Sequence, residues 1–248
     1  MANWLILAIV IILVAFVPCI IYLAWIRNTE KFSREPYARL ISVFLFGAIG
    51  SVLVAVVFEL ILTIPFNDNI DRVYDYLGEN PTIPVLVLAC VIAPFVEEAA
   101  KGLGILRARR MMTELENGII YGAAVGLGFA ATENMLYETT ALMEGGAQAF
   151  IATAVIRSVS SALLHATASS LFGLGIARKV LGTGGWLIYY LGAVAMHSVF
   201  NYAASFGTLY EDQLGEIAYL IGLCAALVIV FIGVSLMRGK IRRLDRRR

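Results

Sequence analysis

Two adjacent glutamates and a lysine stand out in the segment APFVEEAAKG, because its surroundings are otherwise almost wholly apolar. Glu97 and Lys101 are spaced i, i+4 and would share one helical face, whereas Glu98 projects about 100° away. A structural ion pair would account for Glu97 and Lys101 but would leave the second carboxylate unexplained. Neighbouring carboxylates in an apolar setting resist double ionisation, so one could hold a proton while the other acts as a base. Lys101 could fix which of the two is ionised.

Three further apolar runs carry polar side chains of the same kind. Glu133 and Asn134 lie in GFAATENMLY, and the chain's only two histidines, His165 and His197, each lie in an apolar run. Asn201 follows His197 at i, i+4 on the same helical face. If these runs cross a membrane, each ionisable group near the bilayer centre costs at least about 2.5 kcal/mol, so a set of them predicts a functional site. We expect these side chains to converge on one polar cavity.

The composition indicates that these runs do cross a membrane. Of the 248 residues, 60% are hydrophobic and 15% are charged, and the mean hydropathy is +0.83. A hydrocarbon core of about 30 Å requires about 20 apolar helical residues, and lipid offers the backbone no other hydrogen-bond partners. The sequence therefore predicts an all-α, polytopic transmembrane helical bundle that forms a single integral membrane domain over residues 1–248. The expected spans are about seven in number: 4–26, 40–64, 83–106, 117–137, 149–177, 185–206 and 215–237.

The basic residues predict the orientation of this bundle. Most of the 19 Lys and Arg residues follow the first, third, fifth and seventh spans, including the basic tail at 238–248, whereas Arg72 lies on the other side. The positive-inside rule then places the N-terminus outside and the C-terminus in the cytoplasm, with the tail near anionic lipid. The net charge of +1 hides this asymmetry and does not indicate nucleic-acid binding. The acidic residues expected in external loops are Asp68, Asp71, Asp75, Glu79, Glu138, Glu144, Glu211 and Asp212.

Other sequence features are expected to be structural. The N-terminus lacks the basic region and cleavage site of a signal peptide, so the first span should be retained in a multi-pass protein of the cell membrane. Single cysteines inside three spans suggest packing rather than disulfides or a metal site. Gly118, Gly122 and Gly126 repeat at four-residue spacing in the fourth span, which permits close packing of two helices.

Four motifs, taken in order, resemble the PrsW family of intramembrane proteases, which is related to the CAAX prenyl protease and bacteriocin-processing (ABI) group. The motifs are E-E-x-x-K at 97–101, F-x-x-x-E-N at 129–134, a histidine at 165 and H-x-x-x-N at 197–201. The CAAX relatives carry F-x-x-x-H at the second motif, and this chain has Glu133 there, which favours PrsW. The resemblance covers about residues 90–205 and implies a catalytic core at about 83–206, with spans 1–64 and 215–237 at its periphery.

This resemblance implies an intramembrane endopeptidase that cuts a membrane-tethered protein, such as an anti-sigma factor, near the external face. By analogy with the CAAX group, a glutamate and His165 would activate water, and His197 with Asn201 would polarise the scissile carbonyl. The catalytic residues expected from the resemblance are Glu97, Glu98, Lys101, Glu133, Asn134, His165, His197 and Asn201.

The family is also described as a metalloprotease group, which gives a second version of the chemistry. In it His165, His197 and a carboxylate, Glu133 or Glu98, would hold zinc, and another glutamate would serve as the base. The chain contains no H-E-x-x-H motif, so spacing alone does not demand a metal. Of the two versions, the metal-free one is favoured at this point, because the adjacent glutamates already supply a carboxylate pair.

Two other classes of function remain open. A proton- or ion-coupled transporter could use Glu97, Glu98, Lys101 and Arg157 as a relay, and it would predict repeated broken helices that the sequence does not show. A non-catalytic membrane scaffold or immunity protein would tolerate replacement of the carboxylates by amides. The expected boundaries also place Glu133 on the external side of the bilayer midplane, so either the fourth span begins later or Glu133 lines the cavity wall.

Overall fold

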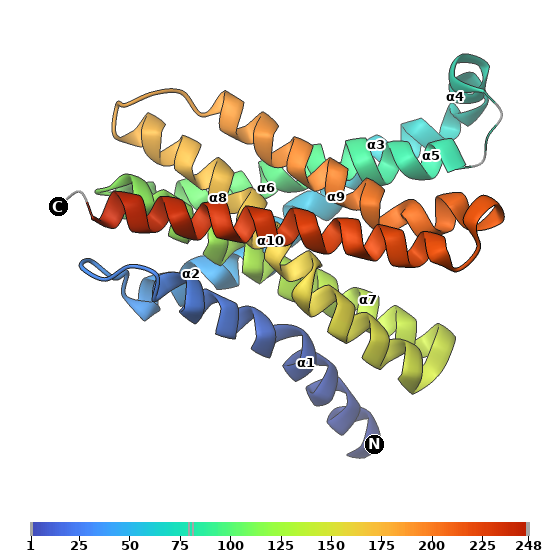
Figure 1. The fold of residues 1–248 in the computed structure, drawn as a ribbon, viewed down its shortest axis with the longest axis horizontal. Helices are drawn as coiled ribbons and strands as arrows, with labels where there is room; N and C mark the ends of the chain where they lie inside the picture. Colours follow the sequence, from blue (N-terminus) through green and yellow to red (C-terminus); the bar gives the residue numbers. More distant parts are fainter. Residues whose placement is uncertain (1, 79, 81, 247–248) are drawn as a thin grey trace.

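The computed structural model describes residues 2–78, 80 and 82–246, and within them it contains helices and connecting turns but no strand (Figure 1). Residue Glu79 of the expected acidic loop and residues 247–248 of the basic tail lie outside the described residues. The elements are α1 (Ala2–Arg27), α2 (Tyr37–Leu45), η1 (Phe46–Ser51), α3 (Val52–Asp68), α4 (Ile70–Leu77), α5 (Thr82–Val87), η2 (Leu88–Ile92), α6 (Ala93–Arg107), η3 (Arg109–Met111), α7 (Leu115–Val159), α8 (Ser161–Val180), α9 (Leu187–Leu214) and α10 (Ile217–Asp245).

Five helical segments of the described chain are long and apolar enough to cross a membrane, which confirms the all-α membrane bundle. They are Trp4–Arg27, Tyr37–Asp68, Thr82–Arg107, Leu115–Val180 and Ile217–Asp245. The fourth has 66 residues and would be about 100 Å long as one straight rod, several times the thickness of a hydrocarbon core. It folds back on itself, and α9, which is not one of these five segments, packs against α8 and α10.

The fold-back occurs at Gly146, whose backbone lies in the left-handed region at φ 69°. We call residues 115–145 the first arm of α7 and residues 147–159 its second arm. The second arm and α8 then run antiparallel to the first arm, and the contacts pair residues 118 with 173, 122 with 169 and 126 with 165, all symmetric about the turn. The first arm continues well beyond the expected boundary at residue 137, so Glu133 lies in the interior of this helix rather than near its end.

The glycines of the fourth span set how closely these helices approach. A Cβ atom at Gly118, Gly122 or Gly126 would lie 2.2–2.3 Å from a carbonyl oxygen of α8, so the two backbones are in direct contact. Gly126 faces the carbonyl oxygen of His165 itself. The packing role expected for these glycines is therefore visible in the structure, and it fixes the position of His165 against the first arm.

The connecting segments that are rich in basic residues and those that are rich in acidic residues lie at opposite ends of the bundle, as the positions of these segments in Figure 1 show. We call the end formed by residues 28–36, 108–114, 181–186 and 238–246 the basic end, and the end formed by 67–78, 143–148 and 211–216 the acidic end. This separation is the pattern that the positive-inside rule uses. The assignment of Glu138 to an external loop was wrong. Glu138 lies within the first arm of α7, and only 1% of its surface is exposed. Most of the basic tail expected at 238–248 is helical, since α10 continues to Asp245.

A buried carboxylate cluster lies at the basic end, in the loop between α1 and α2. Glu30 is only 1% exposed, its Oε2 accepts the backbone N–H of Glu35 at 3.2 Å, and its Oε1 has no partner in the described part of the protein. Burial raises the pKa of Glu30 to about 7, and the nearby carboxylates of Glu35, Glu116 and Asp245 add to the increase, while the N–H of Glu35 opposes it. Glu30 therefore holds its proton more tightly in the folded protein than in the unfolded chain.

The raised pKa of Glu30 predicts a pH-dependent stability. The contribution of Glu30 to the free energy of unfolding is fully present below its ordinary pKa of 4.5 and is lost as the pH rises through about 7. We expect Glu30→Gln to remove this part of the pH dependence. At pH values above 7 the variant should unfold at a higher midpoint temperature than the parent protein, as measured by thermal unfolding in detergent micelles between pH 5 and 8. The exposed Glu144 provides the control, and an equal effect of Glu144→Gln would refute the assignment.

Candidate active site

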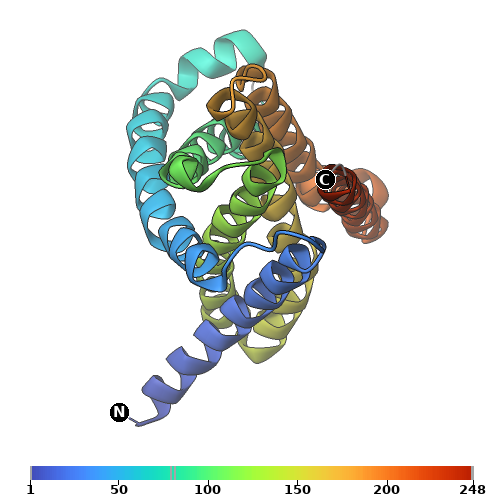
Figure 2. The ribbon, with the colours of Figure 1, turned by 90° about the vertical axis from the view of Figure 1, so that its left-hand side faces the viewer.

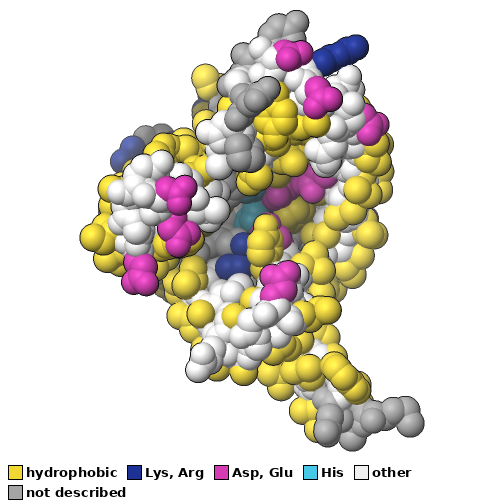
Figure 3. Space-filling view, turned by 90° about the vertical axis from the view of Figure 1, so that its right-hand side faces the viewer, with side chains coloured by type: hydrophobic (Ala, Val, Ile, Leu, Met, Phe, Trp, Pro, Cys, Tyr) yellow, Lys and Arg dark blue, Asp and Glu magenta, His cyan; other side chains and the backbone are white. Residues whose placement is uncertain are grey.

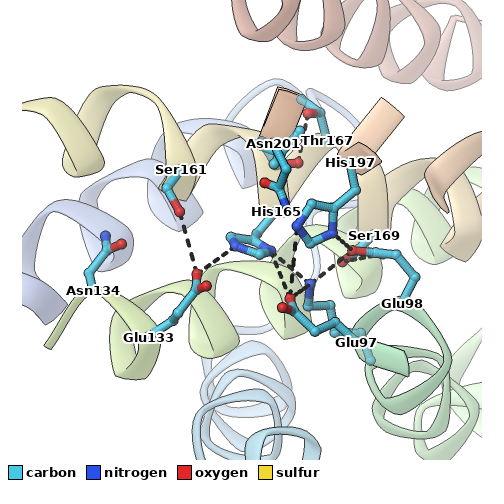
Figure 4. A network of polar contacts seen from close by, with 12 residues as sticks. Glu97, Glu98, Glu133, Asn134, Ser161, His165, Thr167, Ser169, His197 and Asn201 are labelled. Carbon is cyan, nitrogen blue, oxygen red and sulfur yellow. Dashed lines mark hydrogen bonds and ion pairs between the residues drawn. The ribbon is translucent and has the colours of Figure 1, made fainter. Parts of the chain in front are cut away.

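Six ionisable side chains from four helices meet inside the bundle (Figure 4). They are Glu97, Glu98, Lys101, Glu133, His165 and His197. The first three come from α6, Glu133 comes from the first arm of α7, and the histidines come from α8 and α9. All except Glu133 are buried. Motifs that lie far apart in the sequence thus form one polar network.

Lys101 lies at the centre of this network. Its Nζ is 2.8 Å from Glu98 Oε1, 3.0 Å from Glu97 Oε2 and 2.7 Å from His165 Nδ1. It also lies 4.2 Å from the centre of the Phe129 ring. The expectation that an ion pair would leave Glu98 unexplained was wrong, because Lys101 reaches one glutamate at i−4 and the other at i−3. One buried ammonium group therefore balances two buried carboxylates.

Each histidine has a carboxylate on the ring nitrogen that faces away from Glu97. His165 Nε2 lies 2.8 Å from Glu133 Oε2, and His197 Nδ1 lies 3.1 Å from Glu98 Oε1. An ionised carboxylate only accepts hydrogen bonds, so in the neutral imidazoles these two nitrogens carry the N–H groups. The opposite nitrogens, His165 Nδ1 and His197 Nε2, then carry no proton, and they lie 3.9 and 4.0 Å from Glu97 Oε2. His165 Nδ1 also accepts a hydrogen bond from Lys101 Nζ at 2.7 Å.

This arrangement fits a metal ion by its donor chemistry. Among the described residues, Glu97, His165 and His197 each offer one ligand atom, and these atoms lie within 4.8 Å of one another. Two imidazoles and one carboxylate form a common catalytic zinc site, and a carboxylate on the far imidazole nitrogen is its usual support. The structure differs here from the ligand set expected from the resemblance, since Glu97 faces both histidines while Glu133 and Glu98 lie behind them.

Arg157 belongs to the network although the sequence analysis assigned it only to the transporter alternative. Its Nη2 donates to Glu133 Oε2 at 2.8 Å and to Ser161 Oγ at 3.0 Å, and its Nε donates to Asn134 Oδ1 at 2.9 Å. The guanidinium group lies 3.8 Å from the centre of the Tyr137 ring. Asn134 is therefore a partner of Arg157 rather than of the histidines. An arginine inside an apolar run was the signal that pointed to it.

Asn201 lies near the site but its side-chain amide is used elsewhere. Its Nδ2 donates to the carbonyl oxygen of Ala89 in the π-helical segment η2 at 2.7 Å. In a π-helix that carbonyl would accept from residue 94, and Pro94 has no N–H. Asn201 supplies the missing donor, and the Tyr190 hydroxyl donates to the carbonyl of Phe95 at 2.8 Å on the other side of the proline. These contacts favour a positioning role for Asn201 over the direct role that the resemblance implied.

Removal of the Asn201 amide should weaken the structure around Glu97. We expect Asn201→Ala to destabilise the protein by about 1–3 kcal/mol, because the Ala89 carbonyl in the partly buried segment η2 loses its donor. Asn69 makes the same type of bond, to the carbonyl of Pro65 at 2.8 Å, but in an exposed position. Asn69→Ala should therefore have a much smaller effect in thermal unfolding, and equal losses in both variants would contradict the role given to Asn201.

The network is accessible from the acidic end. Figure 3 shows a hollow at that end, with histidine, acidic and basic side chains visible inside it and acidic residues around its rim. The exposed side-chain fractions fall from 22% for Glu133 and 18% for Arg157 to 9% for Glu97 and 0% for Lys101. Glu133 and Arg157 are thus the outer part of the network, and Lys101 is its closed inner part.

Comparisons with known proteins identify the family to which the sequence is similar. The profile described as PrsW family intramembrane metalloprotease matches residues 35–235, which extends beyond the expected 83–206 core into α2 and α10. A relative called Protease PrsW from Clostridioides difficile (strain 630) is 35% identical over 128 residues, which are 50% of this chain and 49% of the relative. The chain therefore matches that curated relative over about half of its length. No solved structure matches this chain significantly. Because the profile covers most of the sequence, the chain belongs to the PrsW family of intramembrane metalloproteases.

Proposed function

We propose that this protein is an intramembrane endopeptidase that hydrolyses a peptide bond of a membrane-tethered protein. The single observation that carries the proposal is the group formed by Glu97, His165 and His197, in which each histidine turns its unprotonated nitrogen toward the carboxylate. Family membership supports the reaction class. This combination favours the metal-dependent version of the chemistry over the metal-free version that the sequence favoured.

In this proposal Glu97, His165 and His197 hold a zinc ion. Such an ion, when bound, polarises the scissile carbonyl and makes a bound water acidic enough to attack at neutral pH. The protein's own contribution is to fix the ligands. Glu98 and Glu133 hold the two imidazoles in a single tautomer and orientation, and this support typically changes metal affinity or activity by 10–100-fold.

The two basic residues of the network hold those carboxylates in turn. Arg157 binds Glu133 from the second arm of α7, and Lys101 binds Glu98 together with Glu97. Ser169 adds a longer hydrogen bond from its hydroxyl to Glu98 Oε2 at 3.3 Å. Each carboxylate therefore has a cationic partner, which lowers the cost of keeping three of them inside a membrane.

The hollow at the acidic end supports a route for the substrate. Glu133 and Arg157 line the accessible part of the network, so an extended peptide would enter from that end. If the basic end is cytoplasmic, the cleaved bond lies toward the external side. The finer proposal is that the substrate is a single-span protein of the cell membrane such as an anti-sigma factor, and it rests on the family resemblance.

Reconstitution tests the proposal. The purified protein in liposomes should cleave some members of a set of single-span reporters with tags at both ends, on the side of the span near the acidic end. A membrane-permeant chelator should abolish the cleavage, and zinc should restore it. If chelation leaves the rate unchanged while Glu97→Gln removes it, the metal-free mechanism applies. If all reporters stay intact both with the protein as purified and with the zinc-loaded protein, the protease assignment itself fails.

A further inference from the structure

A second hollow lies apart from the active site, between α8, α9 and α10 near the basic end. This groove has a volume of about 470 Å³, within the range of sites that bind small molecules. Its walls are mainly apolar and include Leu171, Leu174 and Met196, and Lys240 and Arg243 of α10 line it at the basic end. None of the six ionisable residues of the active site lines it.

α9 and α10 approach most closely near the acidic end, whereas the groove lies toward the basic end. Near the acidic end they pack closely, since a Cβ atom at Gly222 would lie 2.5 Å from the carbonyl oxygen of Ala203. Near the basic end α10 is bound to the loop after α1 instead. The Asp245 carboxylate accepts the backbone N–H groups of Lys31 and Phe32 at 2.9 and 3.3 Å. The two helices therefore diverge, as Figures 1 and 2 show.

A second contact strengthens this attachment of α10 to α1. Arg238 donates to Thr29 Oγ1 at 3.0 Å and lies 3.9 Å from the centre of a ring of Trp25. On the groove side of α10, a Cβ atom at Gly239 would meet nothing within 4 Å, which indicates open space. The groove is thus a consequence of the fold and does not depend on one side-chain rotamer.

The polar groups of the groove are arranged for an amphiphile. The hydroxyls of Thr167 and Ser170 donate to backbone carbonyls at 2.8 Å, so their hydrogens are already used. Lys240 and Arg243 are one helical turn apart, both are exposed, and neither has an ion-pair or hydrogen-bond partner among the described residues. The groove therefore combines apolar walls with two uncompensated positive charges at one end.

We propose that this groove binds an anionic phospholipid, with an acyl chain between α8, α9 and α10 and the phosphate between Lys240 and Arg243. Basic pockets between transmembrane helices on the cytoplasmic side are typical sites for anionic lipid headgroups. A neighbouring apolar groove, lined by Phe172, Trp186 and Tyr190, has Lys179 as its single cation and lacks this pair. The lipid would hold α10 against α8 and α9 at the end where the protein itself leaves a gap.

Lipid binding can be measured by native mass spectrometry of the full-length protein released from nanodiscs. Phosphatidylglycerol should be retained in preference to phosphatidylcholine with the same acyl chains. The double variant Lys240→Gln/Arg243→Gln should bind phosphatidylglycerol about thirtyfold more weakly, since each basic residue near an anionic surface contributes about a factor of five. The matched control Arg109→Gln/Arg110→Gln removes two exposed charges at the same end but outside the groove and should retain the lipid.

Two further measurements separate the acyl chain from the headgroup. Gly239→Phe fills the open space and should reduce retention of both lipids, whereas the glutamine pair should remove only the preference for the anionic one. Inorganic phosphate should not displace phosphatidylglycerol at concentrations far above that of the lipid. Equal affinity for the two lipids, an equal loss in the Arg109/Arg110 control, or displacement by phosphate alone would overturn the proposal.

Discussion

Glu97→Gln is expected to abolish zinc binding and cleavage, while the variant still inserts into the membrane and accumulates. Glutamine keeps the shape of the side chain and can still accept a hydrogen bond from Lys101, but an amide oxygen is a poor zinc ligand. Since Glu97 is the carboxylate that both unprotonated histidine nitrogens face, its loss should reduce activity by more than about 100-fold. Zinc content of the purified protein and cleavage of a reporter measure the two effects independently.

Glu98→Gln provides the matched control on the same helix. Glu98 is completely buried and supports His197 from behind, so its replacement should lower zinc affinity and activity by about 10–100-fold without eliminating either. His165→Ala and His197→Ala should behave like Glu97→Gln, because each removes a ligand. If Glu98→Gln loses zinc and Glu97→Gln keeps it, the ligand set must be reassigned, and if both variants stay fully active the carboxylate mechanism is excluded.

The sequence predicted which polar residues meet inside the bundle better than it predicted which contacts each of them makes. Polar side chains in apolar runs are costly, so Glu97, Glu98, Lys101 and the two histidines were identifiable by type alone. Three glutamates of the same type cannot be ranked from spacing, because the rotation of each helix decides which one faces the histidines. The structure provides that rotation: Glu97 faces both histidines, and Glu133 contacts the His165 nitrogen that faces away from Glu97.

The roles of Arg157 and Asn201 could not be derived from spacing for a related reason. Arg157 reaches Glu133 only because the chain reverses at Gly146 and brings residues 157 and 133 side by side. Asn201 donates to the carbonyl of Ala89, for which Pro94 offers no N–H, and this partner lies 112 positions away in the sequence. By contrast, the packing role of the glycines at 118, 122 and 126 follows from spacing alone, because two helices need small residues to approach closely.

Lys101→Met is expected to tighten zinc binding, because Lys101 and a metal ion compete for the same electron pair. The Nε2 of His165 donates to Glu133, so Nδ1 has a single lone pair, and the ammonium of Lys101 occupies it at 2.7 Å. A zinc ion can bind Nδ1 only after Lys101 releases it. The variant should therefore bind zinc at least about tenfold more tightly in a competition assay with a coloured chelator, which is about 1.4 kcal/mol.

The same substitution should make folding dependent on the metal. Without zinc, Glu97 and Glu98 lose their shared cation, and breaking a buried pair of this kind costs about 3–5 kcal/mol, so zinc should raise the unfolding temperature far more in Lys101→Met than in the parent protein. Arg157→Met is the control for general electrostatics, because it removes a nearby cation that touches Glu133 but not the Nδ1 lone pair. If both substitutions increase zinc affinity equally, only the net charge of the network matters. A larger effect of Lys101→Met would mean that the ammonium blocks a ligand position, so that zinc loading requires Lys101 to move.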